Sequence, residues 1–269
     1  MYIYHYTTIK ALYGIMKNKE FWWGNTSSMN DRNERLEFIG RITGAVREDF
    51  GPSEKCDEFC RHIEAEASTD FPFAMCFSTQ AEDASQWERY ADRAQGVCLK
   101  INSEVFASLL EGCNVVFNNV YYDFDVRNHR YYPLINSYFT DGSIHGEAGI
   151  YDLESLASHI LASAPIYKNH SFWGESERRV YTLLGLPFCD NPDTYRYDYE
   201  SKDNEIKRYL KIRYDLLCLK KGIKPDDMIE EVVIGPRGRQ NIEELKAFCI
   251  DMGFPGLAAN IRLSNCPLR

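Results

Sequence analysis

The stretch Phe172–Arg179 holds the side chains best suited to chemistry, because two carboxylates and two guanidinium groups follow one another within it. Glu175 and Glu177 would project to the same side of an extended chain. Carboxylates turned inward beside an apolar strand are costly to bury unless a partner or a function compensates them. In a cleft, one carboxylate could stabilise an oxocarbenium-like transition state while the other orients a hydroxyl. The alternative is a solvated strand entrance at which glutamate and arginine pair.

The opening segment Tyr2–Thr7 offers a second polar group. It alternates, with tyrosines on one side and Ile3, His5 and Thr7 on the other, which is typical of a β-strand. The ring nitrogens of His5 could bind a ribose hydroxyl, since each is a directed donor or acceptor. The alternative is a histidine that hydrogen-bonds a neighbouring backbone carbonyl.

Aromatic side chains form a third candidate group on a short predicted helix that Asp83 and Gln86 begin as a capping box. Trp87 and Tyr90 lie three residues apart, on one face of that helix. This spacing usually means packing on the core. The same rings could instead form a shelf for a base or a nicotinamide, so both interpretations stay open.

Three weaker signals each have a plain structural alternative. Met29–Asp31 with Glu34 could supply functional polar groups, but such residues commonly cap and begin a helix. Gly235–Arg239 could hold a phosphate on its amides and arginines, or form an exposed turn. Cys56–His62 contains Cys-x-x-x-Cys-x-His without an evident fourth ligand, so we expect no bound metal.

Strand and helix patterns are mixed along the chain without a regular β-α-β repeat. Strands are predicted from alternation or short apolar runs at 2–7, 21–23, 73–78, 96–101, 115–122, 178–184, 210–218, 229–234 and 257–263. The polar segment 123–150 has no clean period and is predicted to be an insertion or lid. We therefore expect a single α+β domain, residues 1–269, with a central mixed, mostly antiparallel sheet flanked by helices.

Charge and composition restrict the partners. Forty acidic residues against 31 basic ones give a net charge of −9, which repels nucleic-acid backbones and argues against general affinity for DNA or RNA. Nine cysteines without a Cys-x-x-Cys pair are typical of free thiols in a reducing cytosol. The opening residues form no signal peptide and no apolar run reaches the length of a membrane span. We expect a cytoplasmic protein with no membrane partner.

Taken in order, the motifs resemble a bacterial family known only as domain of unknown function 2971. The ordered set spans nearly the whole chain and is more specific than any single motif. It comprises His5-Tyr6-Thr7, Met29-Asn30-Asp31 with Glu34, Phe77-Ser78, Gln86-Trp87 through Tyr90-Ala91, Gly96-Val97, Glu175-x-Glu177-x-Arg179, Ile234-Gly235-Pro236 and Ser264-x-x-Pro267-x-Arg269. The chain departs from the family pattern at Leu268, where an aromatic residue is more usual, and in the long segment 123–150.

More distantly, an early His-x-Thr and a late glutamate on a core strand are similar to ADP-ribosyltransferase toxins that modify nucleic acids. This resemblance implies an ADP-ribosyltransferase-like fold with NAD as co-substrate. It implies that His5 holds a ribose of NAD and that Glu177 stabilises the cation formed as nicotinamide leaves. The catalytic residues so implied are Glu177, Glu175 and His5, and the cofactor-binding residues are His5, Tyr6, Thr7, Ser78, Trp87, Tyr90 and Arg179. The arginine that these toxins carry after the first helix has no match here.

The leading hypothesis is an NAD-consuming ADP-ribosyltransferase or glycohydrolase that serves phage defence or acts as a toxin. Its acceptor, a protein or a nucleic acid, is left open. The alternative is a non-catalytic module that senses a small nucleotide-like ligand in a defence or stress system. A nuclease is a third possibility, and only Asn30, Asp31 and Glu34 offer polar groups for its metal.

Overall fold

The chain forms two compact units, and each unit takes residues from separate parts of the sequence. Unit 1 comprises Met1–Asn25, Phe73–Asn119 and Glu175–Arg269, and unit 2 comprises Thr26–Pro72 and Val120–Gly174. The computed structural model describes residues 1–28, 34–66, 71–122, 124–142, 144, 152–202 and 204–268. Every strand of the described residues belongs to unit 1, whereas the regular elements of unit 2 are helices.

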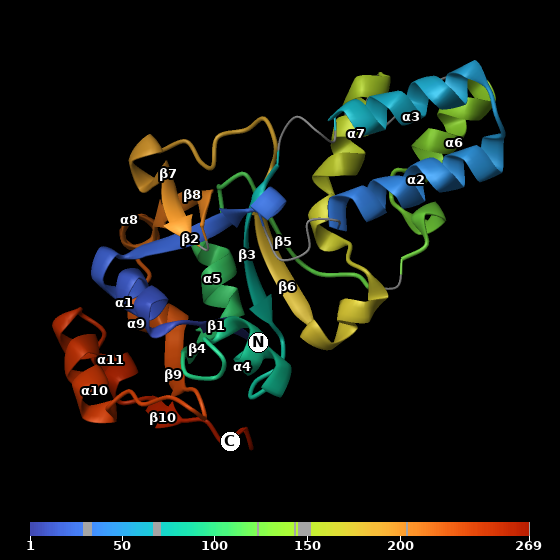
Figure 1. Ribbon diagram of the computed structural model, residues 1–269. Coiled ribbons are helices and arrows are strands. Elements are labelled where there is room, and N and C mark those ends of the chain that lie inside the picture. The colour runs from blue at the N-terminus through green and yellow to red at the C-terminus, as the bar shows by residue number, and fades with distance from the viewer. Residues whose placement is uncertain are drawn as a thin grey trace. The chain divides into compact units, whose positions relative to one another are not determined.

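The strands of unit 1 form one mixed sheet in the order β10-β9-β4-β1-β3-β2-β8-β7, with β6 and β5 added beside β3 (Figure 1). The strands are β1 (Tyr2–Thr7), β2 (Glu20–Asn25), β3 (Phe73–Ser78), β4 (Val97–Asn102), β5 (Val115–Asn119), β6 (Glu177–Thr182), β7 (Tyr195–Lys202), β8 (Glu205–Arg213), β9 (Ile229–Ile234) and β10 (Ile261–Leu263). The pair β9–β10 is parallel, and the other pairings of the described strands are antiparallel. The predicted α+β class with a mostly antiparallel mixed sheet is confirmed.

The sheet branches at β3. One edge of β3 pairs with β6 from Ala74↔Tyr181 to Ser78↔Glu177. The other edge is shared, because β2 pairs with its first two residues and β1 pairs with its last residue through Tyr4↔Ser78. The end of β3 and the beginning of β6 therefore meet β1 at one point, where Ser78 lies between Tyr4 and Glu177.

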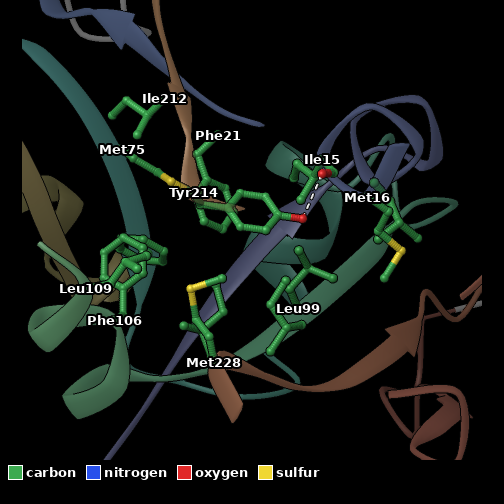
Figure 2. Close-up of a cluster of buried hydrophobic side chains, with 14 of the residues drawn as sticks. Ile15, Met16, Phe21, Met75, Leu99, Phe106, Leu109, Ile212, Tyr214 and Met228 are labelled. Carbon is green, nitrogen blue, oxygen red and sulfur yellow. Dashed lines mark hydrogen bonds between the residues drawn. The ribbon is translucent and has the colours of Figure 1, made fainter. Parts of the chain in front are cut away.

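Helices cover the sheet, and their local signals agree with the sequence. Thr8 caps α1 by accepting a hydrogen bond from the Ala11 amide, and Asp83 caps α4 by accepting one from the Gln86 amide. The helices of unit 1 are α1 (Ile9–Asn18), α4 (Ala84–Tyr90), α5 (Ser103–Leu109), α8 (Tyr214–Lys221), α9 (Pro225–Met228), α10 (Ile242–Asp251) and α11 (Pro255–Ala258), with the 3₁₀ turn η5 (Pro192–Thr194). Figure 2 shows the core beneath them, where the Tyr214 hydroxyl donates to the Ile15 carbonyl at 2.9 Å.

Unit 2 has its own apolar core, built from Phe38, Ile42, Phe59, Ile135 and Ile160 among others. Its elements are α2 (Glu34–Phe50), α3 (Glu54–Glu66), α6 (Tyr132–Asp141), α7 (Leu153–Ala162) and the 3₁₀ turns η1 (Thr26–Ser28), η2 (Val126–Asn128), η3 (Ala164–Ile166) and η4 (His170–Glu175), the last of which ends in unit 1. Helix α6 lies within the segment 123–150, which has no clean period in the sequence and was predicted to be an insertion or lid. No helix of the described residues has the length and apolar character needed to cross a membrane.

Two strand predictions are wrong in part. The predicted strand 257–263 begins in helix α11, and only Ile261–Leu263 form β10. The predicted strand 210–218 is wrong in its second half. Residues 210–213 belong to β8, but Tyr214–Lys221 form helix α8. Apolar residues alternate through 218, yet Tyr214, Leu217 and Cys218 are the buried ones, at the helical spacing of three and four residues. Strand β7, whose tyrosines at 195, 197 and 199 alternate with polar residues, was not predicted.

Candidate functional site

Glu175 and Glu177 lie at the branch point, and both side chains are buried. Their residues are 5% and 7% exposed, respectively. Ser176 between them has a left-handed φ of 45°, so the chain is not extended here as expected. Glu175 ends η4 and Glu177 begins β6. The predicted alternative of a solvated strand entrance is therefore wrong about solvation, although both glutamates do pair with arginines.

The polar residues of α4 converge on Glu175. Its Oε1 accepts a hydrogen bond from the Tyr90 hydroxyl at 2.8 Å and one from Arg89 Nη1 at 3.1 Å. Its backbone carbonyl accepts from Ser78 Oγ at 3.0 Å and from Gln86 Nε2 at 3.4 Å. The Arg89 side chain is 53% exposed, so this network extends from a buried carboxylate to the protein surface.

Glu177 and Arg179 form a buried bidentate ion pair. Arg179 Nε donates to Glu177 Oε1 at 2.6 Å, and Nη2 donates to Oε2 at 2.9 Å. Residues two apart on a strand project to the same face, which makes this pairing possible within β6. Two fork-like hydrogen bonds fix the plane of the carboxylate. Because burying two charges costs several kcal/mol per ion, such a pair is weak evidence for stability and invites a functional explanation.

His5 does not share a pocket with these acids. Its Nδ1 lies 3.1 Å from the Cys76 carbonyl oxygen, and its ring makes an edge contact with Phe77. Burial lowers the pKa of His5, and the hydrogen bond to Cys76 offsets part of that effect. This is the backbone-satisfied histidine of the structural alternative.

Strand register separates His5 from Glu177. Tyr4 lies opposite Ser78, and Ser78 lies opposite Glu177, so these three side chains share one face of the sheet. His5, next to Tyr4, projects to the other face, and β3 separates β1 from β6 by two strand spacings of roughly 5 Å each. The resemblance to ADP-ribosyltransferase toxins implies that His5 and Glu177 act on one NAD molecule, but the register places their side chains on opposite faces of the sheet.

Trp87 cannot be an open shelf for a nicotinamide, because its side chain is fully buried. The Trp87 ring packs edge-on against Tyr6, and its Nε1 donates to Glu82 Oε2 at 3.3 Å. The Tyr6 hydroxyl donates to the Gln80 carbonyl and accepts from the Asp83 amide, each at 3.1 Å, and burial raises its pKa. Of the predicted aromatic contacts, Tyr90 is the one that is only half-buried.

Two further family motifs have structural roles. Gly96 and Gly235 lie where backbones approach closely, since a Cβ would stand 2.2 Å from the Thr7 carbonyl oxygen at Gly96 and 2.3 Å from that of Ala94 at Gly235. The amides of residues 235, 237 and 238 donate to the carbonyls of Gly96, Ala94 and Gly235. They are therefore not free to bind a phosphate, and Gly235–Arg239 is a turn. Thr7 itself is buried.

Met29–Asp31 lies outside the described residues. Glu34 begins α2 and pairs with Lys168 at 3.0 Å, both within unit 2, so it takes part in an ion pair of that unit. Cys56 and Cys60 are buried on α3. Within the described ranges, no three His, Cys, Asp or Glu side chains gather closely enough to hold a metal ion.

Arg89 and Glu82 were not predicted. Glu82 has a φ of 57° and accepts hydrogen bonds from Trp87, Arg262, Ser264 and the Asn265 amide. Burial alone would raise its pKa, but the hydrogen bonds outweigh this effect and hold the pKa below its usual value. Ser264 belongs to the predicted C-terminal motif, and its contact with Glu82 connects the C-terminal segment to the residues that precede α4. The spacing Gln86-x-x-Arg89 is the sequence signal that could have pointed to Arg89.

The fold and site define an α+β protein with two buried carboxylates, each paired with an arginine, at a branch point of the sheet. Residues 86–180, roughly a third of the chain, match the model of a family described as "Protein of unknown function (DUF2971)". The matched range contains Gln86, Arg89, Tyr90 and the Glu-x-Glu-x-Arg motif, and it confirms the resemblance to that family. No curated protein and no solved structure matches the chain.

Proposed function

We propose that this protein is an NAD-consuming ADP-ribosyltransferase or glycohydrolase that uses the carboxylates at the branch point. The observation that supports the proposal is the burial of Glu175 and Glu177, which flank Ser176 where η4 ends and β6 begins. Each carboxylate forms an ion pair with an arginine. A fixed, desolvated carboxylate stabilises a developing cation strongly, because it needs no reorganisation during the reaction. An ordinary surface salt bridge would not require this burial.

In the proposed reaction the bond between nicotinamide nitrogen and ribose C1′ breaks, and the electron pair leaves with nicotinamide. Glu177 faces the cation that forms at C1′, and Glu175 accepts the proton of the water or acceptor hydroxyl that attacks there. Tyr90 and the exposed part of Arg89 are the ligand contacts, since both side chains hydrogen-bond Glu175 and the Arg89 side chain extends to the protein surface. His5 supports the branch from the opposite face and takes no direct part.

The test is release of free nicotinamide from NAD by the purified chain, alone and with cell lysate or nucleic acid as acceptor. Glu177→Gln should lower turnover by roughly 100-fold or more while NAD still binds, because positive charge develops on the ribose only in the transition state. Glu175→Gln should lower turnover as well.

Glu20→Gln is a matched control. Glu20 is equally buried, at 4% exposure, and is held by both Arg196 terminal nitrogens, but it lies on β2. If Glu177→Gln and Glu20→Gln leave the same turnover, the catalytic role of Glu177 is refuted. Melting curves of both variants show whether each still folds.

A second function is favoured by the Glu177–Arg179 pair, since the guanidinium neutralises the negative charge with which Glu177 would stabilise a cation. In that case the protein senses a nucleotide-like ligand without converting it. NAD would then bind and raise the melting temperature while no nicotinamide appears. A role in phage defence or toxicity is proposed for the enzyme, and loss of cellular NAD on expression of the wild type but not of Glu177→Gln would support it.

A further inference from the structure

Two cysteines far apart in the sequence lie opposite each other in unit 1. Cys113 lies between α5 and β5, and Cys189 lies between β6 and β7. The two residues form an isolated antiparallel bridge. Both are free thiols, and Cys189 is 7% exposed whereas Cys113 is half-buried. The function proposed above uses neither residue.

Hydrogen bonding defines the geometry of this bridge. The Asn114 amide donates to the Phe188 carbonyl at 2.8 Å, which connects the residue after Cys113 to the residue before Cys189. That pattern makes the cysteines a non-hydrogen-bonded pair, in which opposite Cα atoms are about 4.5 Å apart and the side chains approach closely. Disulfides span Cα separations of about 4.4–6.8 Å. The backbone is therefore already positioned for a cross-strand disulfide.

The two side chains lie on the same side of the bridge, as opposite residues of an antiparallel pair do, and Cys189 Sγ lies 2.9 Å from Thr194 Oγ1. Burial raises the pKa of Cys113 to about 12, with a further contribution from the neighbouring Cys189. Because the thiolate is the attacking form, oxidation should be slow at neutral pH and faster in alkaline buffer.

We propose that Cys113 and Cys189 are an oxidative modification site that forms a reversible disulfide with low-molecular-weight disulfides such as oxidised glutathione. One cysteine thiolate attacks a glutathione sulfur, which breaks the glutathione S–S bond and releases one glutathione thiol. The second cysteine then attacks the mixed disulfide, forms the Cys113–Cys189 bond and releases the second glutathione. The two protein thiol protons end on the two glutathione thiols, so two protein thiols are oxidised and one glutathione disulfide is reduced.

The bond would tie the turn before β5 to the connection between β6 and β7. The closed loop includes β5 and β6, and β6 carries Glu177 and Arg179. Restricting a loop of this length in the unfolded chain stabilises the folded state. We expect the oxidised protein to melt roughly 5 °C or more above the reduced protein.

The native full chain is treated with oxidised glutathione at pH 8.5, and the reagent is removed. The protein is then unfolded in a denaturant that contains iodoacetamide, which alkylates every remaining free thiol. Peptide mass spectrometry should find Cys113 and Cys189 joined, with the mass of two hydrogens lost, and dithiothreitol should restore both thiols. Cys56 and Cys60 provide an internal control. They lie four residues apart on α3, a spacing that holds their Cβ atoms about 5–6 Å apart, too far for a disulfide. Cys56 and Cys60 should therefore be found alkylated.

Cys113→Ser and, separately, Cys189→Ala should abolish the cross-link and the increase in melting temperature. The proposal is overturned if Cys113 and Cys189 of the treated wild type are both fully alkylated. It is also overturned if one of them stays in a mixed disulfide with glutathione, or if another pair of cysteines is joined at higher yield. None of these outcomes depends on NAD turnover.

Discussion

Replacing His129 with glutamine should remove a specific loss of stability in acid. His129 is 2% exposed in unit 2 and is surrounded by the rings of Phe38, Phe124, Tyr131 and Tyr167. Burial, with a smaller effect of the neighbouring Arg130 charge, lowers its pKa to about 4 from the ordinary 6.5. The folded protein therefore holds this imidazole neutral where an unfolded chain would protonate it.

Hydrogen bonds explain why the neutral ring fits. The Tyr131 amide donates to His129 Nδ1 at 3.2 Å, so the ring proton lies on Nε2, which donates to Ser163 Oγ at 2.7 Å. Ser163 Oγ in turn donates to the Ile160 carbonyl. A proton on Nδ1 would face the Tyr131 amide hydrogen and break this arrangement. Glutamine can keep the donor to Ser163 without a titrating group.

The size and sign follow from linkage. The unfolded state takes up a proton below pH 6.5 and the folded state only near pH 4, so stability is lost as the pH falls through this window. At about 1.36 kcal/mol per pH unit, His129 costs about 2 kcal/mol at pH 5 and about 3 kcal/mol in full. Other titrating groups change wild type and variant alike.

The assay is urea unfolding of wild type and His129→Gln at pH 7.5 and pH 5. The difference in free energy of unfolding between the two proteins should shift by about 2 kcal/mol in favour of the variant on acidification. The higher pH serves as the internal control, since neither state protonates the ring there. Parallel pH dependence of the two proteins would refute the reasoning, and an NMR titration of His129 gives the pKa directly.

Two further changes test the packing of unit 1. Gly96→Ala should destabilise the fold by about 3 kcal/mol or more, because the added Cβ would overlap the Thr7 carbonyl. The control is Gly14→Ala on helix α1, which has open space around it and should stabilise the fold by about 0.5–1 kcal/mol. Equal melting temperatures of the two variants would contradict this prediction. Tyr214→Phe should cost about 1 kcal/mol by removing the hydrogen bond to the Ile15 carbonyl in the core, and an unchanged denaturation midpoint would show that this bond contributes nothing.

Local signals in the sequence located most elements well. The predicted strands at residues 2–7, 73–78 and 229–234 have the observed bounds, and Thr8 and Asp83 cap helices as expected. These features depend on side chains within a few residues of one another, which is why periodicity and capping patterns detect them. The error at Tyr214 arose because its apolar pattern fits both a strand and a helix, and burial decided between them.

Residue chemistry also singled out Glu175, Glu177 and Arg179 as a group, and the order of motifs indicated the resemblance to the family whose model matches residues 86–180. What the sequence could not determine was the set of partners. Arg89 and Tyr90 reach Glu175 from more than 80 positions away, and no local pattern encodes that contact. Whether two charges lie in water or in the interior depends on how distant segments pack around them.

Tertiary structure alone decided the geometry of the predicted site. The branch at β3 and the strand register put His5 and Glu177 on opposite faces, because a side chain's face is fixed by its pairing partner and not by its own sequence. The same packing buried Trp87 completely and brought Cys113 opposite Cys189. Sequence determined which groups are able to react, and the long-range pairing of strands determined which of them meet.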